Sequence, residues 1–377
     1  MYGGLIVAFY LVLLGFVWHR DPSSRSDFMA FYSAGRMALG GDAAGAYDWS
    51  RLQVLQAELL GVPAEVVAPF LGWVNPPHFF FFVTPFAPLS YHGGWIAWIL
   101  ATGVLFALAA RSVMPSAGAA AAIAALATPG VLYTLSVGQN GLLIGALMGW
   151  TFALMDRRPA AAGVALGLLT IKPQFGVLLP LILVATGRWR VFGAAAATAL
   201  LCLAAALLAF GPEAWWGFLG ALSRNQEIYL AERTSVLPRI QSVYALVFWL
   251  GADRALAWAV HGVFAAAVAG VVLRLWLRRP EGPEEARAAA AIAGAFLVTP
   301  FTWIYDTPAL AMAALFLARA GLRDGFLPAE RLLLVLACAS VEVMAFLGPH
   351  PAYAPAAWLV MLGLAWRRDR AWRRAPR

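Results

Sequence analysis

The chain has 377 residues, of which 62% are hydrophobic and 12% are charged. Soluble domains contain about 45–50% apolar and about 25% charged residues, so this composition excludes a soluble globular protein and indicates an integral membrane protein. The net charge of +8 comes from short arginine clusters between apolar segments, which is typical of cytoplasmic loops and does not indicate a nucleic-acid partner. Cys202 and Cys338 each lie in an apolar run and predict neither a disulfide nor a metal site.

The chain begins with an apolar segment at about residues 3–18. It lacks the basic start and the cleavage site of a signal peptide, so we expect a retained membrane helix. The interval 19–75 that follows is polar and holds more acidic than basic residues, which places it in the periplasm. Within it, apolar residues at helical spacing from Phe28 predict an amphipathic helix that lies on the membrane surface and ends at Gly40–Gly41. A second helix is expected over residues 49–60.

Two later segments are apolar but interrupted by proline. Residues 77–88 are short for a crossing, which takes about 20 residues, and broken backbone at this depth is expected where protein or a wet cavity surrounds it. The number of crossings within residues 77–110 stays open. Short apolar arms at about 159–171 and 174–186 meet at Lys172–Pro173. The basic residues flanking the two arms belong inside, so Lys172, the only lysine of the chain, is expected at the outer turn of a hairpin.

The remaining apolar segments lie near residues 93–110, 117–135, 140–155, 191–210, 255–277, 287–302, 307–319, 328–346 and 356–366. Residues 211–250 are expected to form a second periplasmic loop, partly inserted into the membrane at its end. The sequence thus predicts an all-α polytopic membrane protein with about 12 transmembrane helices and both termini in the cytoplasm. We expect one domain over residues 1–377, and no internal repeat or inverted duplication is evident.

On this topology the unusual polar residues fall on or near the periplasmic helix ends: Asp27, Asn75, His78, Gln139, Asn140, Lys172, Arg239, Gln241, Tyr305 and Asp306. Ionisable groups at membrane depth usually face a cavity or one another, so we expect these residues to share one surface.

Several of these residues also have a simpler explanation that the sequence leaves open. Asp27, Gln139–Asn140 and Asp306 each precede an expected helix and could cap it. Asn75 stands before two prolines, as a turn residue does. His78 could lie at the membrane interface, and Lys172 could extend to the lipid headgroups.

The chemistry that this set suggests is glycosyl transfer. An acceptor hydroxyl needs a carboxylate that takes its proton during attack on the anomeric carbon, and Asp27 is the candidate base. A leaving phosphate needs cations, for which Lys172 and Arg239 are candidates. No paired-aspartate motif of the metal-dependent nucleotide-sugar enzymes occurs, so we expect a lipid-phosphate donor, no cofactor and no metal site.

A series of short motifs occurs in order along the chain: Asp27–Phe28 through Tyr32, Gly40–Gly41 with Tyr47, Asn75–Pro76–Pro77 with Pro85 to Leu89, Gly138–Gln139–Asn140, Gly163, Gly167 and Lys172–Pro173 before Arg188 to Arg190, Gln241–Ser242–Val243, and Thr299 to Asp306. Together they resemble the bacterial polyprenyl-phosphate-sugar-dependent transferases of glycosyltransferase family 87, which have the GT-C fold. The position after Tyr305 differs from relatives that carry histidine there.

The resemblance implies an inverting hexosyltransferase, with mannose the first candidate sugar. Its donor would be a polyprenyl-phosphate sugar and its acceptor a periplasm-facing lipid or glycan, at the bacterial inner membrane. Asp27 falls where such families keep the essential aspartate. We expect the substrate-binding residues to be Tyr32, Asn75, His78, Gln139, Asn140, Gln241, Tyr305 and Asp306.

Two alternative functions predict different sequence features. A transporter or flippase of a lipid-linked glycan would be expected to have repeats with broken helices in matching positions, and the sequence has broken segments without that symmetry. A membrane scaffold would leave Asp27, Lys172 and the proline-broken segments without a common reason. Glycosyl transfer is therefore the favoured prediction.

Overall fold

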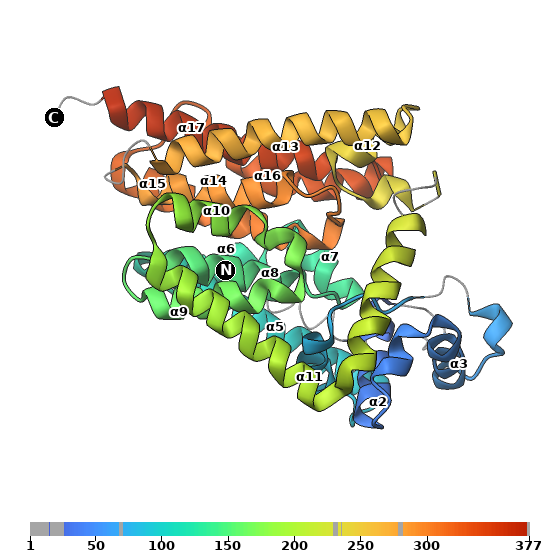
Figure 1. Ribbon diagram of the computed structural model, residues 1–377. Coiled ribbons are helices and arrows are strands. Elements are labelled where there is room, and N and C mark those ends of the chain that lie inside the picture. The colour runs from blue at the N-terminus through green and yellow to red at the C-terminus, as the bar shows by residue number, and fades with distance from the viewer. Residues whose placement is uncertain are drawn as a thin grey trace. The chain divides into compact units, whose positions relative to one another are not determined.

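The computed structural model describes residues 15, 26–67, 71–228, 233–234, 236–277 and 282–374. Within these ranges the chain consists of helices joined by turns and loops (Figure 1). The described residues also contain one isolated antiparallel bridge, between Ile240 and Trp303. The prediction of an all-α protein is confirmed, and the expected helix at residues 3–18 lies outside the described residues. The chain forms two compact units: unit 1 is Met1–Val104, Thr134–Gln139 and Ala199–Ile228, and unit 2 is Leu105–Tyr133, Asn140–Thr198 and Tyr229–Arg377.

The first part of unit 1 contains short helices, namely α2 (Phe28–Leu39), α3 (Trp49–Leu60), α4 (Phe80–Val83) and the 3-10 turns η1 (Ala44–Tyr47), η2 (Ala64–Val66), η3 (Pro77–Phe79) and η4 (Thr84–Phe86). Both helices expected in the polar interval are confirmed, with α2 ending at Gly40. Helix α3 begins at Asp48, whose carboxylate accepts the N–H groups of the first turn, and it ends at the left-handed Gly61. The proline-rich stretch is broken into η3, α4 and η4, as predicted.

Helix α2 is an internal helix of unit 1, so the prediction that it lies on the membrane surface is wrong. Every residue from Phe28 to Gly35 is buried. The Phe31 ring meets the rings of Trp73, Phe79 and Trp98 edge-on, with centroid distances of 6.0, 5.3 and 5.6 Å. Trp73, Phe79 of the proline segment and Trp98 of the next helix thus cover the helix face that was assigned to lipid.

Three helices within the described ranges are long and apolar enough to cross a membrane: α5 (Tyr91–Val113), α11 (Trp189–Gln226) and α13 (Arg254–Leu277). The pair α6 (Ala119–Leu126) and α7 (Pro129–Val137) would add a fourth span, bent by 67°. Helix α11 is broken at Gly211, which has φ +75°, before Pro212. It then continues to Gln226, so the first part of the loop predicted over residues 211–250 is helical. The count of about 12 crossings stays a prediction.

The other helices of unit 2 are α8 (Gly141–Leu154), α9 (Pro159–Leu168), α10 (Leu178–Ala185), α12 (Val243–Trp249), α14 (Glu284–Leu297), α15 (Pro308–Asp324), α16 (Glu330–Leu347) and α17 (Tyr353–Arg374). Its 3-10 turns are η5 (Pro115–Ala117), η6 (Leu169–Ile171), η7 (Pro173–Gly176), η9 (Leu237–Arg239) and η10 (Ile304–Asp306). Helix α9 with η6, and η7 with α10, are the two arms predicted to meet at Lys172–Pro173.

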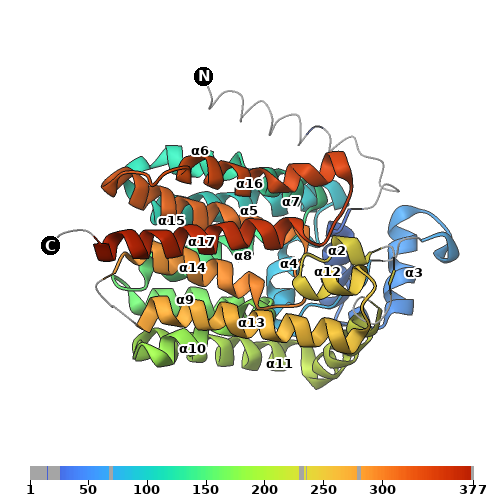
Figure 2. The same cartoon turned by 90° about the horizontal axis from the view of Figure 1, so that it is seen from above.

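Helix α14 is the central element of unit 2 and packs against α13, α15 and α17, which lie beside it in both ribbon views (Figures 1 and 2). All of its residues from Glu285 to Leu297 are buried. Most of them are alanine, and small side chains allow neighbouring helix backbones to approach closely.

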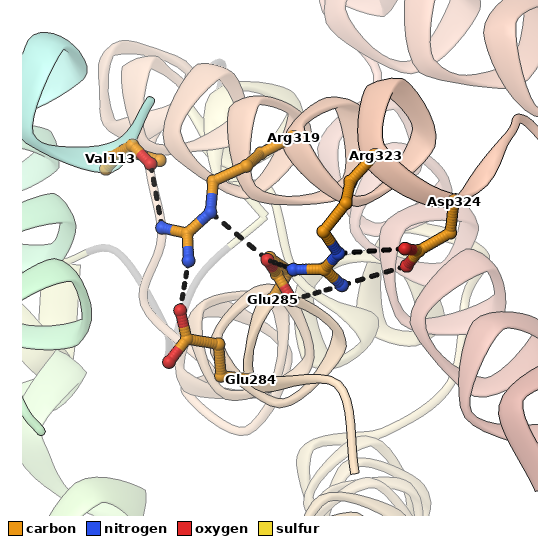
Figure 3. Close-up of polar contacts among 6 residues, drawn as sticks. All are labelled: Val113, Glu284, Glu285, Arg319, Arg323 and Asp324. Atoms are coloured by element: carbon orange, nitrogen blue, oxygen red, sulfur yellow. Dashed lines mark hydrogen bonds and ion pairs between the residues drawn. The ribbon is translucent and has the colours of Figure 1, made fainter. Parts of the chain in front are cut away.

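An ionic network closes the open end of the α14–α15 hairpin (Figure 3). The fully buried carboxylate of Glu285 accepts from Arg319 Nε at 3.1 Å and from Arg323 Nη1 at 2.5 Å. Arg319 also pairs with the half-exposed Glu284 and donates to the Val113 carbonyl at 3.1 Å. Arg323 forms a second, two-fold pair with Asp324. Both arginines of α15 are thus tied to the first turn of α14.

Removing the charge of Glu285 should therefore destabilise the protein. Glu285→Gln should lower the free energy of unfolding by about 2 kcal/mol, because hydrogen bonds between charged groups are lost around a buried position. Glu284→Gln is the matched control and should cost less than about 1 kcal/mol, since the side chain is 47% exposed. Denaturant unfolding of both variants in detergent measures the difference, and equal losses would contradict the role given to Glu285.

Candidate functional site

The first group of predicted residues lies in unit 1, around the start of α2. Gln139 Nε2, between α7 and α8, donates a hydrogen bond to Asp27 Oδ2 at 3.3 Å. Asp27 is half-buried and occupies the N-cap position of α2, but its side chain makes no capping hydrogen bond there. The capping explanation therefore does not account for this carboxylate.

Glycine at position 138 permits this approach. Gly138 has φ +72°, and a Cβ atom there would lie 2.7 Å from Phe28 Cβ and 2.7 Å from Trp95 Nε1. The Phe28 ring in turn packs against Trp95 and Tyr91, with centroid distances of 6.3 and 5.8 Å. The segment that carries Gln139 thus comes close to the start of α2 along an aromatic wall.

The other predicted residues of unit 1 have these positions. Tyr32 packs against Phe28, and its hydroxyl donates to the Leu89 carbonyl at 2.8 Å. The Asn75 carbonyl accepts from the Tyr47 hydroxyl at 2.7 Å. His78 is buried, and its ring stacks on that of Trp215 at 6.2 Å.

The second group lies in unit 2 and contains a buried ion pair. Lys172 Nζ donates to Asp306 Oδ1 at 2.5 Å, with residue exposures of 7% and 0%. Asp306 Oδ2 accepts the backbone N–H of Trp303 at 2.9 Å, and Lys172 Nζ lies 4.7 Å from the centroid of the Tyr305 ring. Burial raises the pKa of Asp306, and the Lys172 ammonium acts in the opposite direction. Lys172 therefore points to a carboxylate inside the protein and not to lipid headgroups. The Asp306 side chain closes the η10 turn by accepting the N–H of Trp303, and the N-cap residue of α15 is Thr307.

The turn that carries Asp306 passes very close to the start of α8. A Cβ atom at Gly141 would lie 1.7 Å from the Tyr305 carbonyl oxygen, and one at Gly130 would lie 2.4 Å from Thr307 Oγ1. Asn140, at the N-cap of α8, is 1% exposed, and its side chain makes no capping hydrogen bond. Only glycine at position 141 leaves room for the η10 backbone.

Gln241 fastens this turn to another part of unit 2. Its backbone N–H donates to the Thr302 carbonyl at 2.6 Å, next to the Ile240–Trp303 bridge. Its side-chain amide donates to the His350 carbonyl at 3.1 Å and accepts the Ala354 N–H at 3.1 Å. Arg239, two residues before it, is exposed and forms no ion pair within the described ranges.

The predicted site residues thus form one group in unit 1 and another in unit 2. That all of them share one surface stays a prediction. Sequence reasoning missed Trp303, Gly141 and Trp95. The glycine after Gln139–Asn140 was a usable signal for Gly141, because a helix rarely gains from glycine in its first turn without a close neighbour. For the two tryptophans, nothing in the local hydropathy distinguishes them from lipid-facing residues.

The helical fold, the helices long and apolar enough to span a membrane, and the buried ionic groups together fit a polytopic membrane protein. The family model described as glycosyltransferase family 87 matches residues 73–300, and the chain belongs to this family. No curated protein and no solved structure matches the chain. Family membership makes the protein a membrane glycosyltransferase and sets aside the transporter and scaffold alternatives. The match includes Gln139, Lys172 and Arg239, while Asp27 and Asp306 lie outside it.

Substitutions of Lys172 and Asp306 should have non-additive effects on the free energy of unfolding. Lys172→Met or Asp306→Asn alone should cost about 3–5 kcal/mol, because each leaves a charged partner buried. The double variant should cost much less than the two single losses added together. Denaturant unfolding of the four proteins in detergent gives the coupling energy, and strict additivity would contradict a buried ion pair.

Proposed function

We propose that this glycosyltransferase moves a sugar, with mannose the first candidate, from a polyprenyl-phosphate donor to a lipid or glycan acceptor. The reaction takes place on the periplasmic side of the bacterial inner membrane and inverts the anomeric centre. The observation that carries the proposal is the Asp27 carboxylate, which is half-buried at the start of α2 and receives the side-chain amide of Gln139.

Asp27 acts as the general base. A hydrogen bond donated by an amide stabilises the ionised form of a carboxylate, which is the form that accepts a proton. The acceptor hydroxyl oxygen forms the new bond to the anomeric carbon, its proton passes to Asp27, and the bond from the anomeric carbon to the phosphate oxygen breaks. The electron pair of that bond leaves on the phosphate, opposite the incoming oxygen, which accounts for inversion.

Lys172 and Arg239 hold the leaving phosphate. An ammonium group has three N–H donors, so Lys172 can bind Asp306 and a phosphate oxygen together. The Tyr305 ring beneath the ammonium and the carboxylate beside it keep Lys172 charged in a buried position. The guanidinium of Arg239 adds an exposed cation from η9. The other predicted residues, among them Tyr305 and Gln241, shape the surrounding substrate contacts.

The type of donor and the charge pattern of the sequence support a reaction at the periplasmic side of the membrane. A polyprenyl chain keeps the donor in the membrane, and a lipid phosphate leaves as a monophosphate that two cations can neutralise. The acidic excess of residues 19–75, which include Asp27, supports a periplasmic position for the base.

Asp27→Asn should abolish transfer without unfolding the protein. The amide cannot accept the acceptor's proton, so we expect kcat to fall by about 10²-fold or more with little change in thermal stability. Sugar transfer from a labelled polyprenyl-phosphate donor in reconstituted vesicles measures the rate. Glu58→Gln removes an exposed carboxylate of the same interval and should retain activity. Near-normal turnover of Asp27→Asn would remove Asp27 from the base role.

Arg239→Gln should raise the KM for the donor and leave the KM for the acceptor nearly unchanged. We expect a change of about tenfold, from the loss of one charge-assisted hydrogen bond to phosphate. Arg239 is exposed, so folding should be retained. Arg51→Gln, which removes another exposed arginine, is the matched control for a nonspecific charge effect. A change confined to the acceptor KM would show that the phosphate assignment is wrong.

A further inference from the structure

Three aromatic side chains of unit 2 gather where α12 ends and α17 begins. The rings of Trp249 and His350 meet edge-on with centroids 4.7 Å apart, and His350 lies 5.5 Å from the ring of Tyr353. Trp249 is 41% exposed, and His350 and Tyr353 are partly exposed. We name these three residues the aromatic platform, and none of them is among the proposed phosphate contacts.

The aromatic platform is joined to the Lys172–Asp306 pair through Gln241. The side-chain amide of Gln241 holds the backbone of His350 and Ala354 on both sides of Tyr353. The backbone N–H of the same residue holds Thr302, directly before Trp303, whose own N–H is bound by Asp306. Gln241, which is buried, therefore holds the backbone of the aromatic platform at a fixed position relative to the turn that carries Asp306.

The chemistry of the platform fits a carbohydrate. One face of a pyranose ring presents C–H groups, which pack on an exposed aromatic ring, while its hydroxyl groups need donors and acceptors at the edge. His350 Nδ1 accepts the N–H of Ala352 at 3.2 Å. In the neutral ring the proton then lies on Nε2, which can donate to a sugar hydroxyl.

We propose that Trp249, His350 and Tyr353 form a binding subsite for a saccharide unit of the acceptor. This inference rests on the proposed function, because that function supplies a glycan-bearing acceptor. The donor carries its sugar directly on the phosphate, at Lys172. A saccharide on the separate platform, reached through Gln241 and Thr302, therefore belongs to the acceptor chain.

Kinetics of Trp249→Ala in reconstituted vesicles test the subsite. The assay uses a labelled polyprenyl-phosphate donor and a titrated membrane extract as acceptor. The acceptor KM should rise about tenfold, because the variant loses roughly one packing contact between an aromatic ring and a sugar ring. The donor KM and kcat should stay within about twofold, since Trp249 touches neither the proposed base nor the phosphate. An unchanged acceptor KM would overturn the proposal.

Anchoring of Trp249 at the membrane interface is the competing explanation, and Trp189→Ala is its control. Trp189 is 60% exposed at the start of α11, beside the arginines expected inside. Equal effects of Trp189→Ala and Trp249→Ala on the acceptor KM would show that Trp249 acts as an interfacial anchor and would overturn the subsite.

A binding measurement separates failure of the subsite from failure of the proposed function. Saturation-transfer NMR with mannotetraose as the probe should give a signal with the wild-type protein, with Trp189→Ala and with the inactive Asp27→Asn, and a much weaker one with Trp249→Ala. Binding without any transfer in the wild-type protein would contradict the proposed reaction and keep the subsite. No signal with the wild-type protein, or an equal signal with Trp249→Ala, would overturn the subsite itself.

Discussion

The buried ion pair of Lys172 and Asp306 is the constraint on which the architecture of unit 2 depends. A lysine and an aspartate that are both enclosed by protein lose their hydration, so each is tolerable only while the other is in place. Lys172 lies at the hairpin between η6 and η7, and Asp306 lies at the turn between α14 and α15. Keeping the pair intact therefore fixes two helical hairpins against each other, 134 positions apart in the chain.

Several contacts in the surrounding structure stabilise the turn that carries Asp306. Gly141 lets the backbone of Tyr305 pass against the first turn of α8, where any side chain would collide with a carbonyl oxygen. Gln241 holds the segment before the turn from the opposite side. At the far end of the hairpin, the Glu285 network ties Arg319 and Arg323 of α15 to α14. Close backbone contacts thus stabilise the turn that carries the ion pair, and salt bridges stabilise the open end of the α14–α15 hairpin.

The sequence predicted what local patterns encode. The helix at 28–39 follows from apolar spacing and from Gly40–Gly41, and the Lys172 hairpin follows from two short arms with a proline between them. The burial of α2 could not be predicted, because an apolar helix face has the same pattern whether lipid or Trp73 and Phe79 cover it. The contacts between Asp27 and Gln139 and between Lys172 and Asp306 join distant segments, which hydropathy does not pair. At Gly211–Pro212 the sequence indicated a helix end, whereas a second helical piece follows directly.

Transfer by the proposed mechanism requires Asp27 as the general base and Lys172 as a contact of the leaving phosphate. A cryo-electron microscopy structure of the Asp27→Asn protein with an intact polyprenyl-phosphate-mannose donor would show both contacts, since the variant should bind the donor without consuming it. We expect the phosphate within hydrogen-bond distance of Lys172 Nζ and the anomeric carbon facing residue 27, with room between them for an acceptor hydroxyl. A donor whose phosphate lies away from Lys172, or whose sugar faces away from residue 27, would contradict the proposed mechanism.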